Sequence, residues 1–540
     1  MRRNLERLAN EEFDLLLIGG GITGACIARD AAMRGLKVAL IEKKDFANAT
    51  SAHNSKLIHG GLRYLRNLEL GLVRESLRER RTWQRIAPHL VQPLPFLIPM
   101  FGGGIKERAS LTAGLTLYDV LSYDRTWLDD PDQRLPRHRW LNKSEAIARE
   151  PILDQKNFQG AFQYYDAQMF SPERLALENV LDANAHGAAV ANYVEATGLM
   201  FRNGRVEGAK VRAAFGGDAF DIRAKFTIIT AGPWADIFLS QALGKPSSHK
   251  LLRSKGIHLI VPPITREMAL TIAANGGHFF VLPWRRHSLL GTTDTKFIGL
   301  PDAVSVTGGD IRGFLSFIDS YLPGANLKPT MVEHFYAGLR PLVDDGTGDT
   351  YDASRRAELV DHGKDDGIDG LFSAIGGKWT TSRDLAEKVT DVIVNRRGAK
   401  TSRCTTAVTP LPGGRIERFR MFADEQRRQY PGISSIEYLS RLYGACLPAM
   451  LSTHADTASM APVGVNGDIA IQIDYALKEE MAVALEDVIM RRTGIGQLGR
   501  PTTATLEQTA AIMGAELGWN EDRKKNEIAS LDRNFSLVSE

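Results

Sequence analysis

Residues 14–24, Asp-Leu-Leu-Leu-Ile-Gly-Gly-Gly-Ile-Thr-Gly, decide the fold of this chain. The four successive apolar residues predict a strand that is buried on both faces. Gly19, Gly21 and Gly24 then show the GxGxxG spacing at a turn into a helix. In this motif the first glycine permits a tight turn, the second admits a pyrophosphate, and the third lets the helix pack on the strand. The N-terminus of the helix adds N–H groups and the positive end of its dipole.

An acidic residue completes this unit after a second strand. Residues 38–41 form another short apolar run, and Glu42 follows it, 23 residues after Gly19. A carboxylate at this spacing binds ribose hydroxyls in dinucleotide-binding units. Because strand, helix, strand and acid occur in the required order, we predict an α/β fold with a Rossmann-like cofactor-binding domain.

Composition restricts the class of protein. The chain has 540 residues, 43% hydrophobic and 24% charged, which is typical of a soluble protein with roughly two to four domains. A net charge of +3 gives no indication of nucleic-acid binding. Cys26, Cys404 and Cys446 are far apart and form no CxxC pair, so neither a disulfide framework nor a metal site is expected. Since the chain shows no signal-peptide core and no run of ~20 apolar residues, we expect a cytoplasmic protein with peripheral membrane association.

A second informative segment begins 13 residues after Glu42 and reads Ser-Lys-Leu-Ile-His-Gly-Gly-Leu-Arg-Tyr-Leu over residues 55–65. Its position places it near a cofactor ring. Arg63 and Tyr64 are side chains suited to a phosphate, and His59 lies beside the glycine pair. We therefore predict that this segment lines a site where a cofactor ring meets an anionic substrate.

Two later segments repeat the transition from strand to glycine. An apolar strand at 226–229 runs into Gly232, and another at 371–375 runs into Gly376, Gly377 and Lys378. Both strands are expected to return to the cofactor-binding sheet. A helix that begins after the second glycine turn would stabilise negative charge on the cofactor ring.

The remaining patterns indicate a cap and a helical region. Strand patterns at 256–261, 279–283 and 288–292 predict an antiparallel sheet that covers the substrate. A Pro-Leu-Pro-Gly-Gly linker at 410–414 precedes an amphipathic, helical C-terminal region.

Eight motifs occur in order along nearly the whole chain, at residues 19–24, 49–51, 55–65, 231–234, 291–294, 338–342, 376–378 and 485–493. With these motifs the chain resembles the flavin-dependent, quinone-linked glycerol-3-phosphate dehydrogenases of the aerobic type, within the D-amino-acid-oxidase-like flavoproteins. The resemblance implies FAD as the cofactor. It also implies an FAD-binding domain built from separated segments, a mixed or antiparallel β-sheet cap and a helical C-terminal domain.

The same resemblance suggests where the domains lie. The FAD-binding domain is expected at 1–95, with further segments at about 160–240 and 345–400. The substrate cap is expected at 245–340, with an associated helical segment at 96–160. The helical C-terminal domain is expected at 405–540.

The implied reaction is oxidation of sn-glycerol 3-phosphate to dihydroxyacetone phosphate by hydride transfer to FAD, with electrons passed to a membrane quinone. Arg63 and Arg340 match the family's substrate-site arginines, with Tyr64 beside them; the alternative for Arg340 is an ion pair with Asp344 or Asp345. The base that takes the hydroxyl proton is His59, His258 or Lys378, and the sequence leaves these alternatives open because a base must lie within hydrogen-bond reach.

The residues expected to bind FAD lie in the glycine turns and in the segment that follows Glu42. They are Gly19, Gly21, Gly24, Glu42, Thr50, Ser51, Ser55, Lys56, Gly60, Gly61, Gly232, Gly376, Gly377 and Thr380. His53 lies 11 residues after Glu42, where some related flavin amine dehydrogenases carry a histidine bound covalently to the flavin. In the family resembled here FAD is normally held without a covalent bond, so we expect His53 to pack behind the site.

The expected partners are glycerol 3-phosphate, a quinone, the cytoplasmic face of a membrane and a second copy of the chain as a homodimer, without nucleic acid. One alternative is an oxidase of the same fold that uses O2. Another is an FAD-dependent amine or amino-acid oxidase, although such an enzyme does not require two phosphate-type arginines. A flavoprotein scaffold that binds without turnover is the alternative from a different class.

Overall fold

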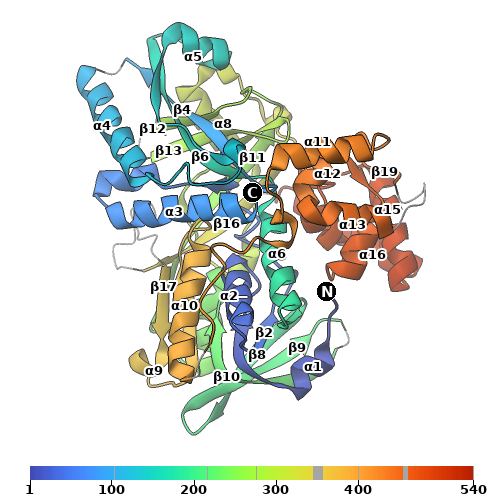
Figure 1. Cartoon of the computed structure of the whole chain (residues 1–540). Helices are drawn as coiled ribbons and strands as arrows, with labels where there is room; N and C mark the ends of the chain where they lie inside the picture. The colour runs from blue at the N-terminus through green and yellow to red at the C-terminus, as the bar shows by residue number, and fades with distance from the viewer. Residues whose placement is uncertain are drawn as a thin grey trace.

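Two large β-sheets and a helical C-terminal region make up the molecule (Figure 1). The computed structural model describes residues 1–102, 104–215, 217–274, 277–344, 357–398, 401–453 and 460–538. Within these residues the expected fold class is confirmed: a largely parallel sheet with flanking helices, a second and largely antiparallel sheet, and helices at the C-terminal end.

The first sheet has the strand order β17-β18-β10-β1-β2-β7. Its strands from β18 to β7 pair in parallel, while β17 pairs antiparallel with β18. Strands β8 and β9 extend from β10 as an antiparallel ribbon. The strands are β1 (Glu12–Ile18), β2 (Val38–Ile41), β7 (Ala189–Ala191), β8 (Val194–Arg202), β9 (Arg205–Ala213), β10 (Ala219–Ile229), β17 (Ala357–Asp361) and β18 (Leu371–Gly376).

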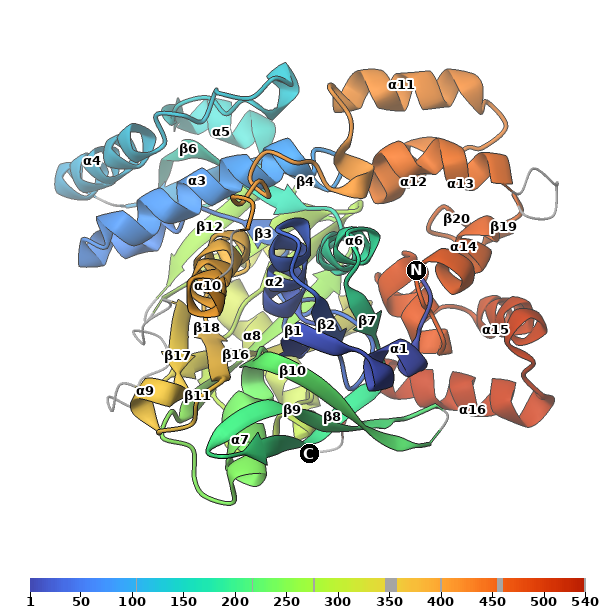
Figure 2. The same ribbon diagram turned by 60° about the horizontal axis from the view of Figure 1, so that its bottom comes forward.

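Burial explains why the first apolar run forms a central strand. After its first residue every position of β1 is buried, as expected for a strand covered on both faces. Helices α2 (Ile22–Met33), α6 (Pro172–Ala185) and α10 (Ser382–Arg397) cover one face, and α2 lies between the other two (Figure 2). Helix α6 begins at Pro172, because the Ser171 hydroxyl accepts a hydrogen bond from the Arg174 N–H and proline occupies the first helical position.

The second sheet forms the cap and has the order β15-β11-β14-β13-β12-β4-β6-β3, with β16 paired to β11 and β5 paired to β6. It contains the three strands expected from the patterns at 256–261, 279–283 and 288–292. Its strands are β3 (Leu57–Ile58), β4 (Val91–Phe101), β5 (Arg139–Asn142), β6 (Phe158–Met169), β11 (Leu251–Val261), β12 (Ala269–Ala274), β13 (Gly277–Trp284), β14 (His287–Gly291), β15 (Thr295–Lys296) and β16 (His334–Val343).

Residues 96–160 differ from the expected helical segment. They contain helices α4 (Ile105–Leu121) and α5 (Lys143–Arg149), but also most of β4 and all of β5. Strand β4 contains three prolines, Pro93, Pro95 and Pro99, which are unusual in a sheet. They are tolerated because β6 pairs with β4 along one edge, whereas β12 pairs with the other edge only at Phe96 and Leu97.

The other helices flank the two sheets or build the C-terminal region. They are α1 (Leu5–Asn10), α3 (Leu70–Ile86), α7 (Ala235–Leu243), α8 (Gly308–Tyr321), α9 (His362–Asp365), α11 (Phe419–Gln429), α12 (Ile436–Tyr443), α13 (Leu447–Thr453), α14 (Ile471–Glu479), α15 (Thr503–Leu517) and α16 (Glu521–Asp532), with the short strands β19 (Pro462–Val463) and β20 (Asp468–Ile469). Among the described helices, none combines the length and the apolar character that a membrane crossing requires.

A buried ion cluster joins the C-terminal region to the first sheet. Asp45, in the loop after β2, is fully buried. Its carboxylate accepts hydrogen bonds from Arg491 Nε at 2.7 Å and from Arg492 Nη1 at 2.7 Å and Nη2 at 2.8 Å. The two guanidinium charges outweigh the burial and hold the pKa of Asp45 well below its usual range. The motif at 485–493 therefore has a structural purpose, since it fixes the helical region against the cofactor-binding sheet.

We expect Asp45→Asn to destabilise the protein by about 3–5 kcal/mol, because the substitution removes the carboxylate that binds the buried guanidinium of Arg492 and one of the three carboxylates that bind Arg491. Thermal unfolding of the purified protein measures the loss, and limited proteolysis reports release of the C-terminal region. Asp424→Asn is the matched control, since it removes an exposed ion pair with Arg427. Equal melting temperatures for the two variants would contradict the anchoring role.

Candidate active site

The candidate site lies where the parallel strands of the first sheet end. Strand β1 runs into Gly19, β2 into Glu42, β10 into Gly232, and β18 ends at Gly376. Because these strands are parallel neighbours, their carboxyl ends meet at the same edge of the sheet. Ligands bind at this edge in open α/β sheets.

The glycine turn after β1 fits a dinucleotide. A Cβ atom added at Gly24 would lie 2.0 Å from the Gly19 carbonyl oxygen, so only glycine lets α2 approach the strand this closely. Gly21 precedes the first residue of α2, as expected for a pyrophosphate-binding turn. Glu42 is oriented by two backbone donors, Gly20 N–H at 2.7 Å and Lys44 N–H at 3.0 Å. These residues could hold the pyrophosphate and a ribose.

Residues 48–56 connect this turn to the cap. The Thr50 hydroxyl donates to the Leu339 carbonyl oxygen on β16 at 2.6 Å. Ser51 Oγ accepts from the Ile22 N–H at 2.9 Å, and the Ser51 carbonyl oxygen accepts from Trp379 Nε1 at 3.1 Å. The loop therefore holds the start of α2, a cap strand and the turn after β18 in one fixed arrangement.

The segment 55–65 lines the junction between the two sheets. The Gly60 N–H donates to Asp166 Oδ1 on β6 at 3.1 Å, and Gly61 precedes the 3-10 helix Leu62–Asn67, which carries Arg63 and Tyr64. The Arg63 guanidinium carbon lies 5.0 Å from the centre of the Tyr64 ring.

Lys378 joins this cluster from the other sheet. Its Nζ lies 3.9 Å from the centre of the Tyr64 ring and donates to Ser76 Oγ on α3 at 3.0 Å. Two cationic side chains that are far apart in sequence, Arg63 and Lys378, thus contact the same aromatic ring. Such a pair can bind a dianion.

Two cap strands carry the other predicted site residues as cross-strand pairs. In the antiparallel register of β11 and β16, His258 faces Tyr336, Gly256 faces Gly338, and Ser254 faces Arg340. Alternate residues of a strand lie on the same face. The structure therefore places His258 and Arg340 on one face of the cap, with two residues that have no side chain between them.

Arg340 is held in place by neutral and charged partners. Its Nη1 donates to Ser254 Oγ at 3.0 Å and its Nη2 to Thr292 Oγ1 at 2.8 Å. Its Nη1 also lies 3.8 Å from a carboxylate oxygen of Asp294. Asp345, one of the two partners in the alternative interpretation of Arg340, lies outside the described residues.

His258 is buried and oriented. Its Nε2 lies 2.9 Å from Ser55 Oγ, and its ring stacks on Tyr336 with 5.0 Å between ring centres. Burial, reinforced by the charges of Arg340 and Lys56, holds the pKa of His258 well below its usual range. The imidazole is therefore neutral at physiological pH, the state in which it can accept a proton.

Three other candidates are placed differently. The backbone of His59 exchanges hydrogen bonds with Thr380 Oγ1, which fixes the chain there. Lys56 was expected to bind the cofactor, but its buried ammonium pairs with Glu173 at 3.1 Å. His53 stacks on Tyr336, on which His258 also stacks, and burial lowers the pKa of His53 to about 4.

Several residues that position the site were missed at the sequence level. Ser254 and Tyr336 could have been found from strand alternation, since each lies on the same face as a residue already selected. Ser76 carries no such signal, because its contact with Lys378 joins segments 302 residues apart.

Comparisons with known proteins define the class first. A family model described as FAD dependent oxidoreductase matches residues 14–383, and a model described as the C-terminal domain of alpha-glycerophosphate oxidase matches residues 404–524. The chain is therefore an FAD-dependent oxidoreductase, and the expectation of FAD as its cofactor is confirmed.

Individual relatives narrow the class. The glycerol-3-phosphate dehydrogenase of Synechocystis sp. is 34% identical over 97% of both chains, and the aerobic glycerol-3-phosphate dehydrogenase of Staphylococcus aureus is 30% identical over 91% of this chain and 88% of its own. The crystal structure of the glycerol-3-phosphate dehydrogenase from Bacillus halodurans with FAD aligns with a TM-score of 0.77 and 26% identity, covering 98% of this chain and 95% of the other. This chain belongs to the glycerol-3-phosphate dehydrogenase family.

We expect Gly24→Ala to abolish retention of FAD, because the added methyl group forces α2 away from the turn that holds the pyrophosphate. The ratio of flavin to protein absorbance after gel filtration measures retention. Gly114→Ala is the control, since a Cβ at this position of α4 meets no atom within 4 Å. Purification of the Gly24→Ala protein with full flavin content would contradict this reading.

Folding stability should fall as the solution is acidified, through His334. This residue is buried on β16, and burial lowers its pKa from 6.5 to about 3. The unfolded chain then binds a proton that the folded chain does not, so stability is lost as pH falls below the unfolded pKa. Between about pH 6.5 and pH 5 the loss is about 2 kcal/mol.

Chemical denaturation at several pH values tests this, with His334→Gln expected to remove that share of the acid sensitivity. His186→Gln, at the end of α6, is the control. An unchanged pH dependence in the His334→Gln protein would contradict the assignment.

Proposed function

We propose that this protein oxidises sn-glycerol 3-phosphate to dihydroxyacetone phosphate and passes the electrons to a membrane quinone. The observation that carries the proposal is the pair of cap residues His258 and Arg340. A neutral imidazole and a guanidinium lie on one face of neighbouring strands. Their backbones are four residues of strand apart, or about 13 Å, but the Arg340 guanidinium lies over Gly256, two residues from His258, which leaves about 7 Å. That spacing suits a small substrate with a hydroxyl group near one end and a phosphate at the other.

The phosphate is bound by cations from both sheets. Arg340 is presented by the cap and fixed by Ser254 and Thr292, so its planar fork is oriented before substrate arrives. Arg63 and Lys378 contact the Tyr64 ring, and they are the proposed phosphate-binding cations outside the cap strands. Glycerol, which has no phosphate, is then a poor substrate.

The proton and the hydride leave the substrate in different directions. When bound, FAD supplies an acceptor for the hydride from the secondary carbon. His258 takes the hydroxyl proton, because it is an uncharged imidazole on the same face of the cap as Arg340. Ser55 and Tyr336 fix the plane of the imidazole, so the accepting nitrogen is held in one orientation.

Anaerobic titration of the yellow protein with glycerol 3-phosphate, glycerol and glycine tests the substrate class. We expect the phosphate ester alone to bleach the flavin. Bleaching by glycine would favour an amine oxidase. Bleaching by glycerol would show that the reaction does not require a phosphate-binding site. Reoxidation by a quinone analogue faster than by O2 supports the proposed acceptor, and the reverse order identifies an oxidase.

A surface beside the site supports a membrane acceptor. Helix α4 packs on α3 and on the 3-10 helix that carries Arg63. Exposed apolar side chains occur on these elements or in the residues that follow them, at Leu68, Leu70, Ile105, Val120, Tyr123 and Trp127. Exposed basic residues, Lys106 and Arg108, lie on the same helix. Apolar and basic side chains together suit the surface of an anionic bilayer, which would place the quinone pool near the site.

Arg340→Ala should cost about 1.5–3 kcal/mol of substrate binding, or about 10- to 150-fold in kcat/KM, because a charge-assisted contact to the phosphate is lost. Steady-state kinetics with an artificial acceptor measures the change. Arg139→Ala, an exposed cap arginine paired with Glu145, serves as the control. Unchanged kinetics in the Arg340→Ala protein would show that Arg340 does not bind the substrate phosphate.

Replacing apolar side chains on α4 should release the protein from membranes. We expect the double variant Ile105→Glu, Val120→Glu to lose cosedimentation with vesicles that contain anionic phospholipid, with glycerol 3-phosphate oxidation by a soluble acceptor retained. Val465→Glu introduces the same charge at an exposed position of the C-terminal region and should still sediment. Equal sedimentation of both proteins would contradict a role of the α4 side chains in membrane binding.

A further inference from the structure

The turn that carries Lys378 is held from one side by helix α3. We propose that Glu79 of α3, through a buried ion pair with Arg383, is a positioning residue that sets the place of the Lys378 ammonium in the substrate site. This inference rests on the proposed function, in which Lys378 contributes to phosphate binding.

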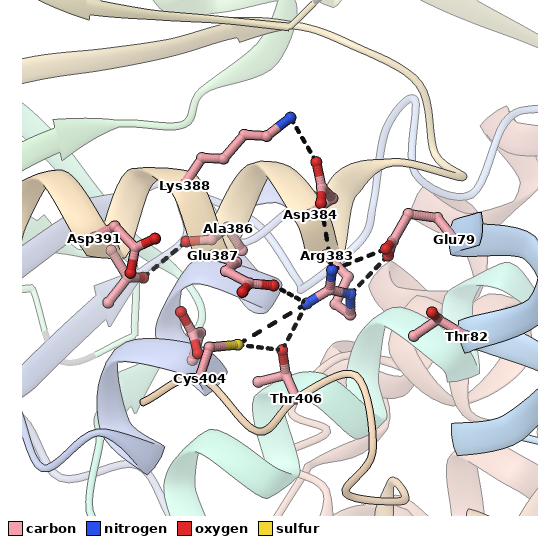
Figure 3. Close-up of polar contacts among 12 residues, drawn as sticks. Glu79, Thr82, Arg383, Asp384, Ala386, Glu387, Lys388, Asp391, Cys404 and Thr406 are labelled. Atoms are coloured by element: carbon pink, nitrogen blue, oxygen red, sulfur yellow. Dashed lines mark hydrogen bonds and ion pairs between the residues drawn. The ribbon is translucent and has the colours of Figure 1, made fainter. Parts of the chain in front are cut away.

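The ion pair is bidentate and buried. Arg383 Nε donates to Glu79 Oε2 at 2.6 Å, and Arg383 Nη2 donates to Glu79 Oε1 at 2.8 Å. The exposed fractions of the two side chains are 4% and 1%. The remaining guanidinium nitrogen donates to Glu387 and Thr406, so the whole group is satisfied in one orientation (Figure 3).

One face of α3 contacts the whole turn. Ser76, Glu79 and Trp83 are three and four residues apart, the spacing of neighbours on a helix surface. Ser76 Oγ accepts from the Lys378 ammonium, Glu79 binds Arg383, and Trp83 Nε1 donates to the Thr380 carbonyl oxygen at 2.9 Å. These contacts reach Lys378, Thr380 and Arg383, so α3 holds both ends of this segment.

The other side of the turn gives Lys378 little support. Gly376 and Gly377 both have positive φ, at 70° and 92°. Consecutive glycines restrict the chain weakly. The strand therefore leaves the place of Lys378 to the contacts made by the residues that follow it. Ser51 and His59 hold Trp379 and Thr380, and α3 contacts the Lys378 ammonium itself. A buried ion pair adds little to the free energy of folding, but its bidentate geometry fixes the two segments that it joins relative to each other.

A matched control exists on the same two helices. Glu75, one turn before Glu79, binds Lys388 of α10 at 3.1 Å, but Lys388 is exposed and lies one turn beyond Arg383 and Asp384. Loss of the Glu75 pair removes a bridge between α3 and α10 without touching the turn at 378–383. Glu75→Gln and Glu79→Gln therefore compare the same chemical change in a largely exposed and in a buried ion pair between the same two helices.

The test uses the FAD-loaded, full-length protein and two measurements. The first is kcat and KM for glycerol 3-phosphate, and the second is the midpoint potential of bound FAD without substrate. We expect Glu79→Gln to lower kcat/KM about tenfold or more, since small misplacement of a binding group is costly. Its flavin content should match that of the wild type. Glu75→Gln should stay within about twofold of the wild type.

Coupling to Lys378 separates positioning from general destabilisation. In a Lys378→Met background, Glu79→Gln should change neither kcat/KM nor the midpoint potential further, because the group that it positions is gone. If Glu79→Gln does not yield soluble protein, Ser76→Ala replaces it in the same cycle, with the same expected non-additivity.

Additive effects of the two substitutions would overturn the inference, as would equal kinetics for Glu75→Gln and Glu79→Gln. A Lys378→Met protein with unchanged kinetics would instead overturn the proposed role of Lys378 and the inference with it. A Lys378→Met protein with impaired kinetics beside an unaffected Glu79→Gln protein would overturn the inference alone.

Discussion

The parallel pairing of β10 with both β1 and β18 is the constraint on which the rest of the structure depends. It brings Ile229 beside Ile18 and beside Ser373, although these residues are separated by more than a hundred positions of chain. Their carboxyl ends share one edge, and every turn that could contact FAD leaves from it. This shared edge of the sheet has a fixed position. Around it lie the cap, the loop at 48–56 and the turn at 376–381.

Two structural features position the side chains of the site. In the cap, strand register does so, because His258, Gly256 and Ser254 pair in order with Tyr336, Gly338 and Arg340. Beside the first sheet, a helix does so, since α3 holds the turn of Lys378 by three contacts on one face. A substrate that spans the junction contacts groups from both, so substrate binding depends on the relation between two otherwise separate sheets. The buried pairs of Asp45 with Arg491 and Arg492 extend the same principle to the C-terminal region.

Local chemistry made much of this predictable from sequence. The GxGxxG turn, Glu42 and the strands at 226–229 and 371–375 are each determined by residues next to one another, and periodicity revealed the cap strands. The strand through Pro93, Pro95 and Pro99 was missed because its tolerance for proline depends on which neighbour pairs with each edge. Ser76, Glu79 and the partner of Lys56 could not be found either, since each acts on a residue more than a hundred positions away.

The most direct test of the proposed substrate site is the structure of the FAD-loaded protein with a non-reactive analogue of glycerol 3-phosphate. We expect the phosphate to lie between Arg340 and the Arg63–Lys378 pair, with the secondary hydroxyl within hydrogen-bond distance of His258. A phosphate bound away from Arg340, or a hydroxyl directed at His59 with His258 out of reach, would contradict it.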